Sequence, residues 1–182
     1  MDLTEKEISS KILFRGKILN LRYDIVRLPN GQEASREVVE HMGGVGIVAV
    51  TDDGKMLLVR QYRRPYDKVI LEIPAGKLND GEDPKECGVR ELLEETGAAA
   101  ENFDYLGSFY ATPGFSNETI HLYLATGLTR GKMHLDADEF LNLEEYSLKE
   151  VENMIDSGEI HDGKTVIGFY RAQKHLHRFS DC

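Results

Sequence analysis

Residues 83–97 read DPKECGVRELLEETG, and this stretch predicts an α-helix with well-defined ends. Asp83 is a suitable N-cap, and Pro84 fits the first helical position because its missing N–H has no partner there in any case. Glu86, three residues after Asp83, strengthens the start signal. Gly97 suits the left-handed conformation that ends many helices. We therefore expect one helix between the cap and this glycine.

The two sides of this predicted helix differ in character. At about 100° per residue, one side collects apolar positions and the other collects acidic ones. We expect the first side to pack into the core; it comprises Val89, Leu92, Leu93 and Thr96. The second side comprises Cys87, Glu91, Glu94 and Glu95.

The acidic side raises an electrostatic problem. The last turn of a helix carries about half a negative elementary charge and favours Lys or Arg, so Glu91, Glu94 and Glu95 oppose both the dipole and one another. Arg90, four residues before Glu94, offsets only a few tenths of a kcal/mol. A hard divalent cation such as Mg²⁺ would stabilise such a cluster, since it binds carboxylates, waters and substrate phosphates. The alternative is a solvated acidic helix face.

The sequence before this helix is rich in β-strand patterns. Residues 11–41 contain β-rich runs joined by the turn signal Pro29-Asn30-Gly31, which predicts a small antiparallel N-terminal β unit. VGIVAV and KMLLVRQY, joined at Asp52-Asp53-Gly54, predict a second hairpin. The apolar stretch VILEIPAG then leads into the loop before the helix.

The sequence after the helix mixes strands and helices. YLGSFYA and IHLYLATGL predict strands separated by the loop TPGFSNE. Ser147 with Glu150 predicts a capped helix to about Asp156, and Asp162 caps a final helix to about His177. Mixed strands with interleaved helices indicate an α/β (α+β) domain rather than a helical bundle.

Composition excludes several classes of function. With 22 Lys and Arg against 32 Asp and Glu, the net charge of −10 repels polyanions and argues against nucleic-acid binding. No basic leader with an apolar run and no stretch of about 18 apolar residues is present, so we expect no membrane partner and a cytoplasmic protein. Cys87 and Cys182 are too few for a disulfide framework, and we expect reduced thiols.

The acidic helix is part of a longer pattern. Five residues separate Gly76 from Glu82, seven separate Glu82 from Arg90, and Glu94-Glu95 and Gly97 follow. This pattern resembles the box of the Nudix hydrolase superfamily; Ala98 departs from it, where the family usually has a larger aliphatic residue. The resemblance implies the Nudix fold, a mixed β-sheet sandwiched between helices, here with the small N-terminal antiparallel β unit. It also implies hydrolysis of a nucleoside diphosphate linked to another moiety.

The resemblance assigns roles to matching residues. Three carboxylates and one backbone carbonyl would be the ligands of Mg²⁺, with Mn²⁺ as a possible substitute: Glu91, Glu94, Glu95 and the carbonyl of Ala75. Arg90 would orient this cluster. Glu82 would either orient it as well or ligate the metal directly.

Further stretches are similar to the ADP-ribose pyrophosphatase subfamily. They are SREVVEH, QYRRP, LEIPAGK and TPGFSNE, with Pro113 lying 16 residues past Gly97. The resemblance implies a homodimer that hydrolyses ADP-ribose to AMP and ribose 5-phosphate. This hydrolysis requires no covalent enzyme intermediate. Residues 1–42 would be a dimer-forming N-terminal β extension and residues 43–182 the Nudix hydrolase domain. The alternatives are another nucleoside diphosphate sugar or dinucleotide as substrate, or a nucleotide sensor with this fold that does not hydrolyse its ligand.

Water must lose a proton as it attacks a phosphorus atom, and a carboxylate that acts as a general base can accept this proton. Glu95 itself is one candidate for this general base. Glu139, in the acidic loop of residues 135–139, is our first choice within that loop, and Asp136 and Asp138 are alternatives.

The remaining candidates concern the substrate. Arg63 would grip the diphosphate, because guanidinium is always charged and pairs bidentately with phosphate oxygens. Arg60 and Arg64 are expected to be surface or ion-pair residues. Glu72 lies between apolar residues, so we expect either a contact with the substrate ribose or a buried ion pair. By the resemblance, Arg36 and Glu37 on the N-terminal strands would contact adenine. These last two would act in the dimer.

Overall fold

The computed structural model describes residues 1–137 and 139–180. Asp138, one candidate base, and Cys182 lie outside this part of the chain. Two compact units are present: Met1–Gly43 with Tyr110–Thr119 form the smaller one, and Gly44–Phe109 with the residues from Ile120 onward form the larger one.

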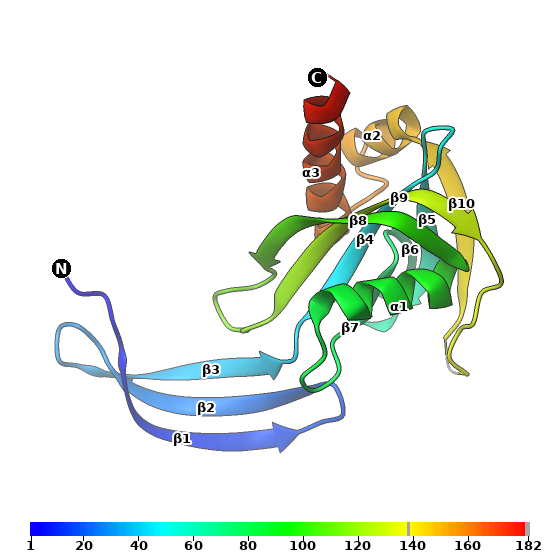
Figure 1. Cartoon of the computed structure of the whole chain (residues 1–182). Helices are drawn as coiled ribbons and strands as arrows, with labels where there is room; N and C mark the ends of the chain where they lie inside the picture. Colours follow the sequence, from blue (N-terminus) through cyan, green and yellow to red (C-terminus); the bar gives the residue numbers. More distant parts are fainter. Residues whose placement is uncertain (138, 181–182) are drawn as a thin grey trace. The chain divides into compact units, whose positions relative to one another are not determined.

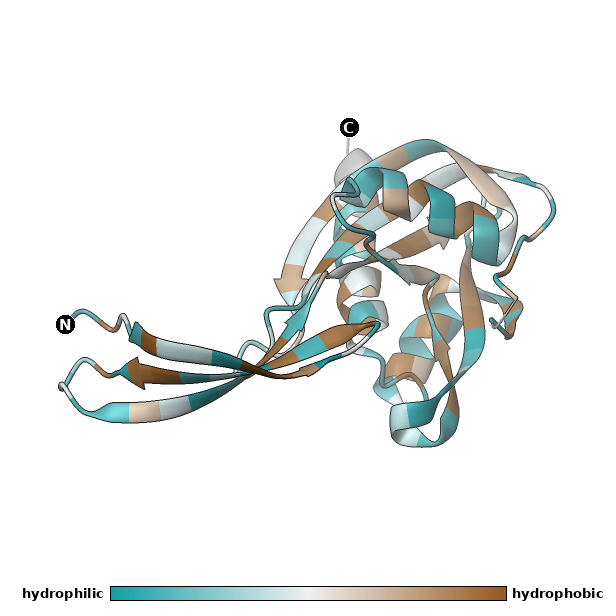
Figure 2. Ribbon diagram, turned by 90° about the horizontal axis from the view of Figure 1, so that it is seen from below, coloured by the Kyte–Doolittle hydropathy of each residue, from teal (hydrophilic) through white to brown (hydrophobic). Residues whose placement is uncertain are grey.

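The smaller unit is built on an antiparallel sheet in the order β1-β2-β3 (Figure 1). Its strands are β1 (Lys6–Arg15), β2 (Leu19–Arg27) and β3 (Glu33–His41). Hydrophilic and hydrophobic residues alternate along these strands (Figure 2). The turn between β2 and β3 contains Gly31 at φ 85°, a conformation that glycine adopts without strain. The predicted N-terminal hairpin is thereby confirmed.

The TPGFSNE loop also belongs to the smaller unit. The N–H of Val39 donates to the carbonyl of Phe115 at 2.7 Å, and the N–H of Asn117 donates to the carbonyl of Val39 at 3.2 Å. The side-chain oxygen of Asn117 accepts from the N–H of His41 at 2.8 Å. The loop therefore satisfies backbone groups at the end of β3.

The larger unit is built on a mixed seven-stranded sheet in the order β10-β5-β4-β9-β8, with β6 paired to β5 and β7 paired to β4 (Figure 1). β4 and β9 are parallel, whereas β4–β5, β5–β6, β4–β7 and β5–β10 are antiparallel. A short 3-10 helix, η1 (Arg64–Tyr66), joins β5 to β6. The strands are β4 (Gly44–Val50), β5 (Lys55–Arg63), β6 (Lys68–Glu72), β7 (Ala75–Lys77), β8 (Ala98–Tyr110), β9 (Thr119–Arg130) and β10 (Leu141–Ser147).

Helices cover both faces of this sheet: α1 (Pro84–Thr96) packs on one face, and α2 (Leu148–Asp156) and α3 (Gly163–Ser180) pack on the other (Figure 1). The alternation of side chains along β4 explains this arrangement. Ile47 faces a core shared with Leu92 of α1, while Val48 faces a core shared with Val151 and Phe169 of α2 and α3. The predicted sheet sandwiched between helices is confirmed. Among the helices of the described chain, none is long and apolar enough to cross a membrane.

The predicted helix caps are confirmed. The side chain of Asp83 accepts from the backbone N–H groups of Lys85 and Glu86, and Gly97 has φ 69°. Ser147 forms a complete capping box with Glu150, the third residue of α2. The side chain of Asp162 accepts from the N–H of Thr165 at 2.9 Å, so it caps α3.

The predicted buried face of α1 is half right: Leu92 and Thr96 are 2% and 5% exposed, as expected, but the other two positions are not buried. Val89 and Leu93 are 49% and 44% exposed, whereas Cys87 is fully buried and Glu95 is 1% exposed. Gly88 lies against the ring of Phe103, which a Cβ would approach to 2.9 Å. The helix is turned so that part of its acidic side packs against the sheet and the loop after β6. The spacing of apolar residues did not predict this orientation of α1, because it assigns carboxylates such as Glu95 to the solvent-facing side of a helix.

Candidate active site

The segment of residues 73–76, whose last two residues begin β7, crosses between two diverging strands. β4 and β5 pair only at Ala49–Leu57 and Val50–Met56, after which β5 pairs with β6 and β4 pairs with β7. The carbonyl of Pro74 accepts from the N–H of Ile47 at 2.9 Å and holds the crossing chain on β4. This path brings the backbone of Ala75 to the C-terminal half of α1.

Glu95 is the most deeply buried carboxylate of α1, with 1% of its surface exposed. Its Oε2 accepts from the N–H of Ala75 at 2.9 Å. Burial raises the pKa of Glu95 to about 8, and the nearby charges of Glu139, Glu91 and Glu72 act in the same direction, against the hydrogen bond from Ala75. A carboxylate in such surroundings favours a positive partner.

Glu91 lies directly against the crossing loop. A Cβ built on Gly76 would lie 1.9 Å from Cδ and Oε1 of Glu91, so only glycine allows this approach. Burial raises the pKa of Glu91, and the charges of Glu94 and Glu139 add to this effect, against the opposing charge of Arg90. The spacing within the box therefore places a glycine where the carboxylate needs room.

Arg90 contacts three acidic side chains. Its Nε and Nη2 donate to Glu82 at 3.0 and 3.2 Å, and its Nη1 donates to Glu91 at 2.8 Å and to Glu94 at 2.9 Å. The hydrogen bond from Arg90 lowers the pKa of Glu82. Arg90 thus fixes the orientation of two carboxylates that the sequence assigns to the metal.

Each metal-ligand candidate on α1 keeps one oxygen available. Within the described residues, Oε2 of Glu91, Oε1 of Glu94 and Oε1 of Glu95 accept no hydrogen bond. Hard oxygen donors with accessible lone pairs fit Mg²⁺.

These side chains do not form a closed cage. Among residues 1–137 and 139–180, no group of three or more His, Cys, Asp or Glu is arranged to hold an ion on its own. Mg²⁺ seldom uses such a cage; it is bound by one or two carboxylates, several waters and substrate phosphates. The donor set therefore fits a metal that is completed by water and an anionic ligand.

The acidic loop before β10 is attached to the end of α1. The N–H of Gly131 donates to the carbonyl of Gly97 at 2.7 Å, and the N–H of His134 donates to the carbonyl of Glu94 at 2.9 Å. Further along, the charge of Glu139 contributes to the raised pKa values of the α1 carboxylates described above. Glu139 is half-buried and Asp136 is exposed. The loop therefore brings Glu139 near the cluster.

The three arginines at the end of β5 have different partners. Arg60 pairs with Glu144 at 2.7 Å and Arg64 pairs with Asp67 at 2.9 Å, which confirms them as ion-pair residues. Arg63 donates its Nε to Glu72 at 2.7 Å. Within the described chain, Nη1 and Nη2 of Arg63 have no hydrogen-bond partner, and 38% of its side chain is exposed.

Glu72 is buried in an ion-pair network that the sequence only partly anticipated. Its Oε1 accepts from Arg63 and its Oε2 accepts from Nζ of Lys164 on α3. Lys164 also pairs with Asp162 at 3.1 Å. Glu72 is 1% exposed, so the structure has the buried ion pair that we weighed against a ribose contact. Lys164 was missed, because a lone lysine at a helix start gives no sequence signal.

The two adenine candidates lie on β3 of the smaller unit. Arg36 is paired with Glu5 through its Nε at 3.0 Å, and Glu37 is exposed opposite Tyr23 of β2. The contacts that the structure gives for both residues stay within this unit.

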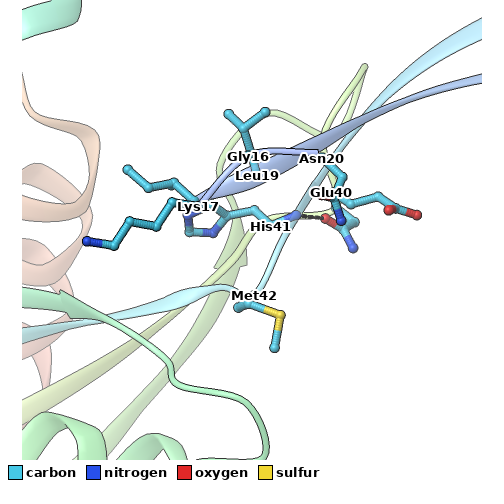
Figure 3. Close-up of a pocket in the computed structure, with 9 residues that line it drawn as sticks. Gly16, Lys17, Leu19, Asn20, Glu40, His41 and Met42 are labelled. Carbon is cyan, nitrogen blue, oxygen red and sulfur yellow. Dashed lines mark hydrogen bonds between the residues drawn. The ribbon is translucent and has the colours of Figure 1, made fainter. Parts of the chain in front are cut away.

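The smaller unit also contains a pocket of about 330 Å³ that the sequence did not predict (Figure 3). The N–H of His41 and the side chain of Asn117 form a hydrogen bond at its wall. Neither Arg36 nor Glu37 is among the described residues that line it. The lining residues are Gly16, Lys17, Ile18, Leu19, Asn20, Glu40, His41, Met42 and Asn117.

Family profiles match nearly the whole chain. The NUDIX domain profile matches residues 40–167, and the profile of the nucleoside diphosphate sugar hydrolase N-terminal domain matches residues 5–39.

Three curated relatives cover most of the chain but carry different names. The chain is 47% identical to a methanol dehydrogenase activator of Bacillus methanolicus, over 90% of this chain and 89% of the relative. It is 43% identical to an ADP-ribose pyrophosphatase of Bacillus subtilis, again over 90% and 89%. It is 32% identical to a GDP-mannose pyrophosphatase of Yersinia enterocolitica, over 96% and 98%.

A solved structure shares the fold. The crystal structure of an ADP compounds hydrolase superposes with a TM-score of 0.86 at 19% sequence identity and covers 97% of both chains. The profile match over most of the chain, the sheet between helices and the box from Gly76 to Gly97 lead to one conclusion. The chain belongs to the Nudix hydrolase family.

Proposed function

We propose that the chain is a Mg²⁺-dependent ADP-ribose pyrophosphatase that forms AMP and ribose 5-phosphate. The observation that carries this proposal is the placement of Glu91 and Glu95 against the loop of Ala75 and Gly76, each with one oxygen available. A relative of that name at 43% identity supports the substrate.

The proposed metal ligands are Glu91, Glu94, Glu95 and the carbonyl of Ala75. Mg²⁺, or Mn²⁺ in its place, would neutralise phosphoryl oxygens and lower the pKa of bound water. Arg90 holds one oxygen of Glu91 and one of Glu94 and thereby orients the other oxygen of each. Glu82 serves this orientation through its two hydrogen bonds from Arg90.

The other roles fall to residues around this cluster. Arg63 binds the diphosphate through the two nitrogens that lack a partner in the described chain. Glu139 accepts the proton of the attacking water, with Glu95 and Asp136 as alternative bases. Glu72 contributes through Arg63, because its own surface is almost entirely buried.

The chain is proposed to act as a homodimer through the N-terminal extension of residues 1–42, with the Nudix hydrolase domain in residues 43–182. The sheet of the smaller unit exposes large apolar side chains, which include Ile8, Leu13 and Phe14 at 45%, 52% and 57%. Sedimentation should give twice the monomer mass. In the dimer, Arg36 and Glu37 would contact adenine, so Arg36→Ala should raise KM for ADP-ribose more than kcat changes.

A substrate panel tests the proposed function. kcat/KM is measured with Mg²⁺ for ADP-ribose, GDP-mannose, other nucleoside diphosphate sugars and dinucleotides, and ADP-ribose should give the highest value. If kcat/KM for GDP-mannose is about tenfold higher than for ADP-ribose, a difference of about 1.4 kcal/mol in transition-state binding, GDP-mannose replaces ADP-ribose as the proposed substrate. If nucleotides bind and none is hydrolysed, the chain is a sensor.

A further inference from the structure

Lys164 occupies a position that ordinary helix electrostatics disfavours. It lies in the first turn of α3, where the helix dipole is positive and acidic side chains are preferred. Only 14% of its side chain is exposed. Burial of an ammonium group is unfavourable unless it is paired, and here Glu72 and Asp162 both pair with it.

The two oxygens of Glu72 have separate donors. Oε1 accepts from Nε of Arg63 at 2.7 Å, and Oε2 accepts from Nζ of Lys164. Arginine prefers to bind a carboxylate with two parallel hydrogen bonds. Arg63 makes one hydrogen bond to Glu72, through Nε, while Lys164 is bound to Oε2; both Nη groups of Arg63 have no hydrogen-bond partner among the described residues.

The same network is connected to the crossing loop. Oγ1 of Thr165 donates to Asp162 at 2.5 Å, and the N–H of Ile73 donates to Oγ1 of Thr165 at 2.9 Å. Ile73 follows Glu72 directly and precedes Ala75 by two residues. The start of α3 therefore fixes the backbone on which both Glu72 and the proposed carbonyl ligand depend.

We propose that Lys164 is a positioning residue: it holds the second oxygen of Glu72 and so leaves both Nη groups of Arg63 free to bind the diphosphate of the substrate. This role deepens the proposed function and rests on it. Without Lys164, Arg63 turns to a two-point hydrogen bond with Glu72 and loses its geometry toward phosphate. Lys164 itself does not touch the substrate.

A kinetic split tests this role. Lys164→Met should raise KM for ADP-ribose about tenfold or more, the size expected when one charge-assisted hydrogen bond is lost, while kcat changes less than about threefold. Lys174→Met removes the same charge from an exposed position on the same helix and should leave both constants unchanged. The same comparison is made by calorimetry in a Glu95→Gln background, in which we expect turnover to be very slow. The Kd for ADP-ribose should rise on adding Lys164→Met by the same factor as KM rises in the otherwise wild-type protein.

A double-mutant cycle identifies the residue through which Lys164 acts. Arg63→Gln should raise KM by itself, and adding Lys164→Met should then raise it less than about twofold further. If the two effects multiply, or if Lys164→Met changes only the unfolding temperature, the positioning role is wrong. Lys164→Ala takes the place of the Met variant if that variant does not fold. Lys164→Gln keeps a hydrogen-bond donor for Oε2 of Glu72 and should therefore give a KM closer to the wild type than Lys164→Met does.

The outcome separates this inference from the proposed function. A wild-type chain that neither binds nor hydrolyses ADP-ribose overturns both. A wild-type chain that hydrolyses ADP-ribose, with Lys164→Met indistinguishable from Lys174→Met, overturns the positioning role alone.

Discussion

Gly76 and Glu91 are in direct contact, and the missing side chain of the glycine provides the space for the carboxylate. A Cβ at residue 76 would lie 1.9 Å from the Glu91 carboxyl group, which sits at the end of a flexible side chain. Gly76→Ala should therefore displace Glu91 without unfolding the protein. We expect kcat to fall at least about tenfold because a proposed metal ligand moves.

The matched control for this prediction is Gly163→Ala. No atom lies within 4 Å of a Cβ at Gly163, and its φ is not positive, so activity and unfolding temperature should stay at the wild-type level. If Gly76→Ala retains full activity, the contact has no functional role.

Glu95→Gln should lower Mg²⁺-dependent turnover at least about 100-fold, because the change removes a charged metal ligand or base. The fold should survive. Gln keeps an acceptor for the N–H of Ala75, and it replaces a buried carboxyl group whose pKa is raised to about 8. Circular dichroism and the unfolding temperature of metal-free protein check the fold; a marked loss of stability would show that Glu95 is mainly structural.

The ends of the elements were predictable from sequence because they depend on local chemistry. Asp83, Gly97 and Ser147 act through hydrogen bonds and backbone angles within a few residues of their own positions. The Pro29-Asn30-Gly31 turn is similarly local. The rest of the fold was predicted from the resemblance to the Nudix hydrolase superfamily, because membership in that superfamily implies the whole order of strands and helices.

The rotation of α1 and the network around Glu72 were not predictable in this way. Both depend on residues far apart in the sequence: Gly76 makes room for Glu91, and Lys164 lies 92 residues from Glu72. A charged residue that is buried by a distant partner looks like a surface residue in a periodicity argument. The pocket around His41 was missed for the same reason, because Asn117 reaches it from a separate segment.

Removal of metal should abolish turnover. Protein treated with a chelator and then dialysed should hydrolyse no ADP-ribose, and Mg²⁺ should restore the rate, with Mn²⁺ as a substitute. Calorimetry should detect Mg²⁺ binding that Glu91→Gln weakens. Full turnover in metal-free protein would rule out the proposed role of the carboxylate cluster.

Asp24 should make the stability of the smaller unit depend on pH in the acid range. The residue is 5% exposed, and hydrogen bonds from Ser10 and Arg22 lower its pKa. A lowered folded-state pKa gives stability that is present above the unfolded value of about 3.9 and is lost as pH falls through the folded value. Hydrogen exchange or urea unfolding from about pH 6 to 2 measures it.

Asp24→Asn should be less stable near neutral pH and should show a smaller loss of stability on acidification than the wild type. Asp52→Asn removes the same charge at an exposed turn and should keep the wild-type pH dependence. Equal pH dependence in all three proteins would contradict the role of Asp24.

Glu139 and Asp136 should differ in their effects on turnover although they share one loop. Glu139 is close enough for its charge to contribute to the raised pKa values of Glu91 and Glu95, whereas Asp136 is exposed and accepts a backbone hydrogen bond from Glu139 at 3.0 Å through its carbonyl. Glu139→Gln should lower kcat about 100-fold or more with little change in KM, the range expected for loss of a general base. Asp136→Asn should retain kcat within about threefold, since its backbone carbonyl is unchanged. If Asp136→Asn is the slower variant, the base assignment moves to Asp136; if both variants are active, Glu95 and Asp138 remain as the candidate bases.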